Sequence, residues 1–197
     1  MTKTVSALFD TYSEASSAVR ALEDSGVPHS DISIVANNSE RWHKESSNAG
    51  TGAEAGAGAG AAVGGVGGLL AGLGIMAIPG VGPVVAAGWL VATAVGAVAG
   101  AAVGGAAGGL VGSLTSSGVP ERDANVYAEG VRRGGTLVTA RVDDARATEV
   151  QSVLQRHKYV DINARGEAYR TTGWSRFNPD TPAYTSDQIA KERALYR

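Results

Sequence analysis

Side chains that could carry out chemistry are few in this sequence and lie far apart. None of the three histidines (His29, His43 and His157) has a carboxylate at metal-ligand spacing. The chain contains no cysteine, which excludes disulfides, thiolate metal sites and a cysteine nucleophile within it. Its many glycines form neither a dinucleotide-binding fingerprint nor a phosphate-binding loop. We therefore predict a protein that is not an enzyme and has no catalytic residue, no metal and no cofactor.

Basic residues on either side of a long apolar segment are candidates for binding. Arg41 and Lys44 precede this segment, while Arg132 and Arg133 follow it and stand just before a predicted strand. All four are candidate contacts for lipid headgroups or another anion. A solvated face is the alternative interpretation of the arginine pair. The net charge of −2 does not indicate nucleic acid as a partner, and no small-molecule substrate is identified.

The apolar segment differs sharply in composition from the rest of the 197-residue chain. No charged residue occurs between Glu54 and Glu121, and most of the 28 glycines lie there. Glycine recurs at every fourth position, which places it along one ridge of a helix and allows close helix packing. We predict that two such ladders mediate helix packing and oligomerisation. Their members are Gly56, Gly60, Gly64, Gly68 and Gly72, then Gly96, Gly100, Gly104, Gly108 and Gly112.

A proline- and glycine-rich turn separates the two ladders. Pro79, Gly80, Gly82 and Pro83 stop one predicted helix and begin the next, which makes a helical hairpin. Its first arm, residues 55–77, would be about 35 Å long, close to the roughly 30 Å of a bilayer core. Glycine disfavours helix in water by about 1 kcal/mol per residue, so lipid or an oligomer must enforce the helix. A flexible linker is the alternative.

The charged regions on both sides of the hairpin show the patterns of a split α/β domain. Hydrophobic periodicity predicts a strand, a helix and a strand before the insertion, then a helix followed by another strand–helix–strand unit. Two βαβ halves indicate an α+β, ferredoxin-like sandwich with its helices on one face of a four-stranded sheet. The predicted strands are residues 4–9, 31–36, 136–142 and 160–164; the predicted helices are 11–26, 120–134 and one that begins at Asp144.

These patterns divide the chain into four parts. The first half of the α/β domain covers residues 1–50, the apolar hairpin 51–118, the second half 119–168, and an aromatic and basic tail 169–197. The tail could dock on a neighbouring subunit or lie at a membrane interface, and disorder is the alternative. Ser186 is predicted to cap a short final helix.

Three stretches resemble the bacterial general stress proteins. They are AIPGVGPVVAAG at residues 77–88, GVPE at 118–121 and YAEGVRRGGTLV at 127–138. Proteins of this family carry a YflT-like heat-induced stress domain, and some are labelled low-temperature-induced. The resemblance extends over residues 1 to about 165 and implies a stress-linked protein without catalytic residues.

The leading functional hypothesis is a non-enzymatic general stress protein that associates with membrane lipid, with itself, or with both. An even number of membrane crossings and the flanking basic residues would keep the α/β domain in the bacterial cytoplasm, at the inner-membrane face. One alternative is a soluble homo-oligomeric ring, shell or filament with the hairpins in its interior. Another is a ligand-sensing ferredoxin-like module, by analogy of fold.

Overall fold

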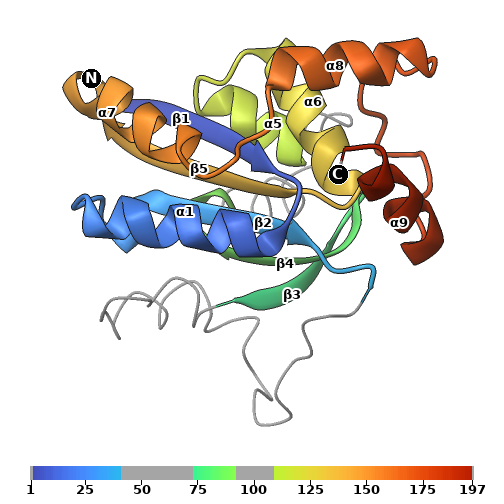
Figure 1. The fold of residues 1–197 in the computed structure, drawn as a ribbon, viewed down its shortest axis with the longest axis horizontal. Coiled ribbons are helices and arrows are strands. Elements are labelled where there is room, and N and C mark those ends of the chain that lie inside the picture. Colours follow the sequence, from blue (N-terminus) through green and yellow to red (C-terminus); the bar gives the residue numbers. More distant parts are fainter. Residues whose placement is uncertain (1, 41–72, 92–108, 197) are drawn as a thin grey trace, which may run out of the picture.

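The structure of the protein, a computed structural model, describes residues 2–40, 73–91 and 109–196. In this part of the chain, helices cover an antiparallel sheet with the strand order β1-β5-β2-β4-β3 (Figure 1). The strands are β1 (Thr2–Phe9), β2 (Ile32–Asn37), β3 (Gly74–Ile78), β4 (Gly82–Gly88) and β5 (Thr136–Asp143). The helices are α1 (Tyr12–Asp24), the short 3-10 helix η1 (His29–Asp31), α5 (Leu110–Ser116), α6 (Glu121–Arg132), α7 (Asp144–Gln155), α8 (Ile162–Thr171) and α9 (Ser186–Ala194).

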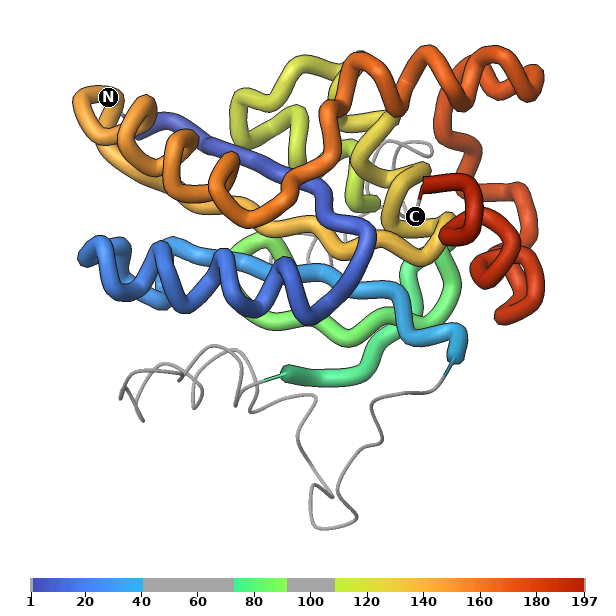
Figure 2. The backbone as a smooth tube through the Cα atoms, in the orientation of Figure 1, coloured from blue at the N-terminus to red at the C-terminus, as the bar shows by residue number. Residues whose placement is uncertain are grey.

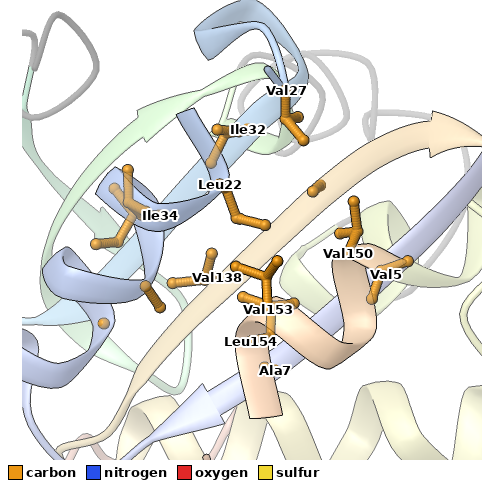
Figure 3. Close-up of a cluster of buried hydrophobic side chains, with 14 of the residues drawn as sticks. Val5, Ala7, Leu22, Val27, Ile32, Ile34, Val138, Val150, Val153 and Leu154 are labelled. Atoms are coloured by element: carbon orange, nitrogen blue, oxygen red, sulfur yellow. The ribbon is translucent and has the colours of Figure 1, made fainter. Parts of the chain in front are cut away.

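One face of the sheet is covered by α1 and α7, as the apolar stripes of these helices predict (Figure 1). Helix α1 begins at the expected cap, where Thr11 Oγ1 accepts a hydrogen bond from the backbone N–H of Glu14 at 3.2 Å. Leu22 and Val150 both belong to the core that these helices form with the sheet (Figure 3). Burying an aliphatic side chain of this size contributes about 1.5–3 kcal/mol. The packing therefore fixes α1 and α7 on the sheet.

The opposite face is also covered, which corrects the prediction that all helices share one side. Helices α5 and α6 lie on this second face, where Leu114 and Val131 are fully buried against Leu137 of β5. Phe177, from the C-terminal region, joins the same core. The sheet is therefore the middle layer of three, because both of its faces are apolar and each must be shielded from water.

The strand predicted at residues 160–164 is wrong, and helix α8 begins there instead. Asp161 caps this helix, because its Oδ1 accepts hydrogen bonds from the N–H groups of Asn163 at 2.9 Å and Ala164 at 3.1 Å. A single hydrogen bond, from Val160 N to the carbonyl of Leu8 at 2.8 Å, remains where a strand would pair with β1. The side chain of Asp161 thus accepts hydrogen bonds from backbone N–H groups that would otherwise be available to pair with a neighbouring strand.

The two predicted helical arms are also wrong where they border the turn. Residues 74–78 and 82–88 form a β-hairpin, with Ile75 opposite Val85 and Met76 opposite Val84. The prediction of a turn between them is correct, and Gly80 and Gly82 adopt the positive φ angles of 74° and 97° that glycine permits. The hairpin extends the sheet to five strands instead of four. Toward the end of the second predicted arm, which begins at Pro83, a helix is present as α5 (Leu110–Ser116).

Candidate functional site

Residues 169–171 of the predicted tail belong to α8, and residues 172–196, called the tail from here on, lie against the rest of the domain. Figure 2 shows the C-terminal end of the chain beside the end of α6, at the opposite end of the sheet from the N-terminus. Phe177 N donates a hydrogen bond to Asn125 Oδ1 at 3.1 Å, and Ile189 of α9 is completely buried. Thr185 caps α9, one residue before the predicted cap. The tail thus encloses a group of charged side chains at the end of α6.

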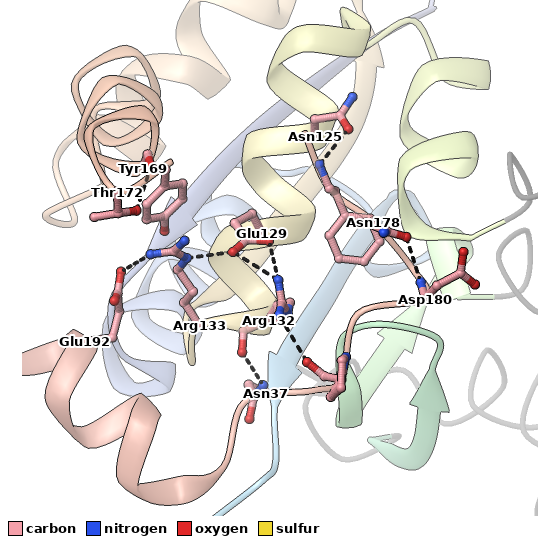
Figure 4. A network of polar contacts seen from close by, with 12 residues as sticks. Asn37, Asn125, Glu129, Arg132, Arg133, Tyr169, Thr172, Asn178, Asp180 and Glu192 are labelled. Carbon is pink, nitrogen blue, oxygen red and sulfur yellow. Dashed lines mark hydrogen bonds and ion pairs between the residues drawn. The ribbon is translucent and has the colours of Figure 1, made fainter. Parts of the chain in front are cut away.

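A buried carboxylate is the centre of this group. Glu129 has no exposed surface, and its Oε1 accepts a hydrogen bond from Arg133 Nε at 2.7 Å. Its Oε2 lies 3.1 Å from Arg132 Nη1. Glu129 and Arg132 lie on α6 and Arg133 is its C-cap residue, so spacings of three and four bring the three side chains to one side of the helix end. We call these residues, together with Glu192, the arginine cluster (Figure 4).

The tail completes the arginine cluster from outside. Glu192 Oε1 of α9 lies 3.0 Å from Arg133 Nη1, which balances two guanidinium groups with two carboxylates. Arg132 Nη2 donates to the carbonyl of Pro182 at 3.1 Å, and its guanidinium carbon lies 4.8 Å from the ring centre of Tyr184. Aromatic faces attract such cations, most strongly where water is excluded. The cluster therefore holds the tail in place by charge and by ring contacts.

Burial and charge act in opposite directions on the pKa of Arg133. Burial alone would lower this pKa, but the hydrogen bonds to Glu129 and Glu192 raise it above its usual range. Arg133 also lies 4.1 Å from the ring centre of Tyr169, whose own pKa is raised by burial. Arg133 thus stays charged and Tyr169 stays neutral at physiological pH. Neither group is poised to exchange a proton.

Three glycines allow the tail to approach the domain closely. A Cβ atom on Gly80 would lie 2.6 Å from Pro179 Cα, and one on Gly82 would lie 2.7 Å from Ala183 Cβ. A Cβ on Gly134 would clash with Cγ2 of Ile189. All three glycines also have positive φ angles. They therefore meet two requirements at once, a left-handed backbone and room for the tail.

A cavity of about 850 Å³ adjoins the tail on the side of α5. Its walls include Leu110, Val111 and Phe177, while Glu121 and Asp180 bring carboxylates to it. The mixture of apolar walls and few polar groups is common in small-molecule sites. In the described ranges, no group of three or more His, Cys, Asp or Glu residues is arranged to hold a metal ion.

The residues predicted to form sites have different places in the structure. Gly56, Gly60, Gly64, Gly68 and Gly72 of the first ladder lie outside the described residues, as do Gly96, Gly100, Gly104 and Gly108 of the second, and Arg41 and Lys44. Gly112 lies in α5 and lines the cavity. Pro79 lies in the turn between β3 and β4 and lines the cavity together with the tail, whereas Pro83 is the second residue of β4. Arg132 and Arg133, the candidate anion contacts, are each only 8% exposed and already paired with Glu129.

Several residues that matter most at this site were missed in the sequence. The spacing of Glu129 from the two arginines, three and four residues apart on a predicted helix, is a recognisable signal for ion pairs. Glu192 and Tyr184 carry no such signal, because they reach the cluster only through the path of the tail.

Taken together, sheet, helices and tail define a small α+β domain whose arginine cluster holds its own C-terminal segment. Residues 4–77 match the family model described as the heat induced stress protein YflT domain. The match begins in β1 and ends in β3, so it confirms the resemblance to stress proteins over these residues. Comparison with curated proteins and with solved structures gives no match. Within the described residues, no helix has both the length and the apolar character needed to cross a membrane.

Proposed function

We propose that this chain is a non-enzymatic stress protein that associates with itself, and with membrane lipid, through its two glycine ladders. The α+β domain then serves as a rigid base from which the ladders extend. The ladders are inferred from the sequence, since all members but Gly112 lie outside the described residues. The described residues on either side of the ladders support the proposal, because β3 follows the first ladder in the chain and β4 precedes the second.

The observation that carries this proposal is the β3–β4 hairpin. The first ladder ends just before β3, and the second follows β4 in the chain. Because the two strands are antiparallel, Gly74 at the start of β3 pairs with Ala86 near the end of β4. The two ladders are therefore joined to the domain at neighbouring points. When two segments are attached at neighbouring points, bringing them together costs little conformational entropy. This favours packing of the two ladders against each other as paired helices.

Both junctions are firmly anchored. Leu73 packs against the core under α1, and Leu90 is almost completely buried in the core on the other face. Trp89 donates a hydrogen bond from Nε1 to the carbonyl of Asp31 at 3.1 Å, and its ring lies under the guanidinium group of Arg141. Fixed junctions lower the conformational entropy that two ladders lose when they pack together.

Cell fractionation combined with particle analysis tests the proposal. We expect the full chain in the membrane fraction, released by detergent, and larger than a monomer after extraction. Large particles that form without detergent and contain no lipid would support the alternative of a soluble ring, shell or filament. A chain that is monomeric and entirely outside the membrane fraction would contradict both forms of the proposal.

The cavity beside α5 favours a second candidate function, the binding of a small ligand. Its volume of about 850 Å³ lies within the range of ordinary ligand sites. A thermal-shift screen of small metabolites against the full chain tests this candidate. Glu121→Ala and Asn125→Ala should weaken any ligand that is found, whereas no stabilisation by any compound would count against it.

A further inference from the structure

The two edges of the sheet differ in how they are protected. At the β1 edge, Leu8 accepts a hydrogen bond from Val160, and Lys3 lies 3.7 Å from Asp144. At the β3 edge, no strand among the described residues pairs with the outer side of Gly74–Ile78. The side chain of Ile75 is 38% exposed there. Among the described residues, the backbone donors and acceptors on the outer edge of β3 therefore have no strand partner (Figure 1).

Natural proteins usually protect such an edge, and three common forms of protection are absent from β3 itself. Charged side chains, a proline within the strand or a β-bulge normally prevents another strand from pairing. The sequence of β3, GIMAI, contains no charge and no proline. Its register with β4 is regular over five pairs, so no bulge twists the strand away. An edge of this kind is suited to accept a further strand.

We propose that β3 pairs with β3 of a second copy of this chain, in antiparallel orientation across a two-fold axis. A strand is its own partner under such an axis, so a second copy supplies apolar side chains of matching type on both faces of the sheet. Met76 and Ile78 would extend the core below α5 and α6, since Ile78 is already part of that core. Ile75 and Ala77 would meet their counterparts on the other face.

The size of this contact decides which kind of partner it fits. Five residues extend over about 17 Å, and one added strand covers less area than a stable complex normally needs. The pairing is therefore weak unless the partner is already held nearby, which raises its effective concentration. This inference rests on the proposed function, because association through the ladders is what would hold a second copy in place. An unrelated soluble protein would lack that advantage.

Single-cysteine cross-linking tests the pairing, because the natural chain contains no cysteine. Opposite residues in an antiparallel pair are about 4.5–5.5 Å apart at Cα, within the range of a disulfide. We expect oxidation of the full-length Ala77→Cys or Met76→Cys variant to give a covalent dimer on non-reducing gels. Separate cysteines at positions 74, 75 and 78 locate the two-fold axis. Thr4→Cys, on the protected β1 edge, is the matched control and should remain uncross-linked.

A second substitution separates specific pairing from chance contact. Ile75→Lys, added to the cross-linking variant, places a charge on the edge and should reduce the dimer at least tenfold, while circular dichroism confirms the fold. Assembled particles without a cross-link at any of the five positions would overturn the β3 pairing but leave the proposed function intact. A monomeric chain without a cross-link would overturn both. Equal cross-linking of Thr4→Cys, or a dimer insensitive to Ile75→Lys, would also refute the pairing.

Discussion

Arg133 Nε lies 2.7 Å from Glu129 Oε1, one helical turn earlier on α6, and both side chains are buried. Removing one partner of a buried pair leaves the other charge without compensation, at a cost of about 3–5 kcal/mol. Here one carboxylate serves two guanidinium groups. We therefore expect Glu129→Gln to lower the free energy of unfolding by an amount in that range, measured by urea denaturation.

Glu167 provides the matched control for this prediction. It also forms a salt bridge one turn along a helix, with Arg170 at 2.7 Å, but its side chain is 75% exposed. Exposed pairs of this type contribute about 0–1 kcal/mol. Glu167→Gln should therefore change stability very little. If both substitutions lowered the free energy of unfolding equally, burial would not explain the contribution of the arginine cluster to stability.

Gly80→Ala should destabilise the protein and release the tail. The positive φ angle of 74° alone disfavours alanine by about 1–2 kcal/mol. The new Cβ would also lie 2.6 Å from Pro179 Cα, so the tail must move. Urea denaturation measures the first effect, and limited proteolysis of residues 172–196 measures the second.

Gly118→Ala separates backbone strain from contact with the tail. Gly118 has a comparable φ of 89°, but a Cβ there would meet nothing within 4 Å. We expect Gly118→Ala to be destabilised only by the backbone strain at its positive φ angle. Its tail should remain resistant to protease. A tail cleaved equally fast in both variants would mean that the Gly80 contact does not hold it.

The sequence predicted elements whose signals are local. The cap at Thr11, the stripe of α1 around Leu22, and helices α6 and α7 are present as expected, because a cap or an amphipathic period needs only neighbouring residues. The Asp161 cap was equally local, yet the apolar Val160 and Ile162 beside it suggested a strand. For short apolar stretches, periodicity alone does not separate the two structures.

Features that depend on distant partners could not be predicted in the same way. Pro79 and Pro83 are compatible with a turn between helices or between strands, and only pairing with β2 decides for strands. The arginine cluster joins Arg133 to Glu192, 59 residues later, through a tail whose path no local pattern indicates. The sequence therefore indicated the two arginines of the candidate site, but not the residues of the tail that pack against them.

Alkaline pH should destabilise the fold through two buried tyrosines. Burial raises the pKa of Tyr127 and of Tyr169, with Asp123 adding to the effect on Tyr127. In the unfolded chain both titrate near pH 10. The folded state therefore binds these protons more tightly, and the resulting stability is complete below about pH 10 and is lost as pH rises through the folded pKa. Urea midpoints measured at increasing pH should fall together with the appearance of tyrosinate absorbance.

Tyr127→Phe tests the source of this pH dependence. The variant loses the hydrogen bond from Tyr127 Oη to the carbonyl of Ser6 at 3.0 Å, so it should be less stable near neutral pH by about 1 kcal/mol. Without the phenol, its stability should fall less steeply above about pH 10. An unchanged slope would assign the alkaline loss to other groups.

The glycine ladders give the prediction on which the proposed function depends. Replacing Gly64 or Gly104 with leucine improves helix propensity by most of 1 kcal/mol and increases hydrophobicity. If helix propensity or membrane insertion determines assembly, both variants should assemble at least as well as the parent chain. If close packing governs, the added side chains should weaken each contact by about 1–3 kcal/mol, repeated at every related interface. We expect the second result, seen as smaller particles in sedimentation velocity.

Val66 provides the control within the same segment, because it lies off the ridge that Gly64 belongs to. Val66→Leu places the same leucine side chain off that ridge, adds only one methylene group, and should leave the particle size nearly unchanged. If Gly64→Leu and Gly104→Leu also assemble like the parent, the glycines are not contact surfaces, and the segment between Glu54 and Glu121 acts as an apolar spacer. Disruption by all three would instead show that the whole segment is tightly packed, with no special role for the four-residue period.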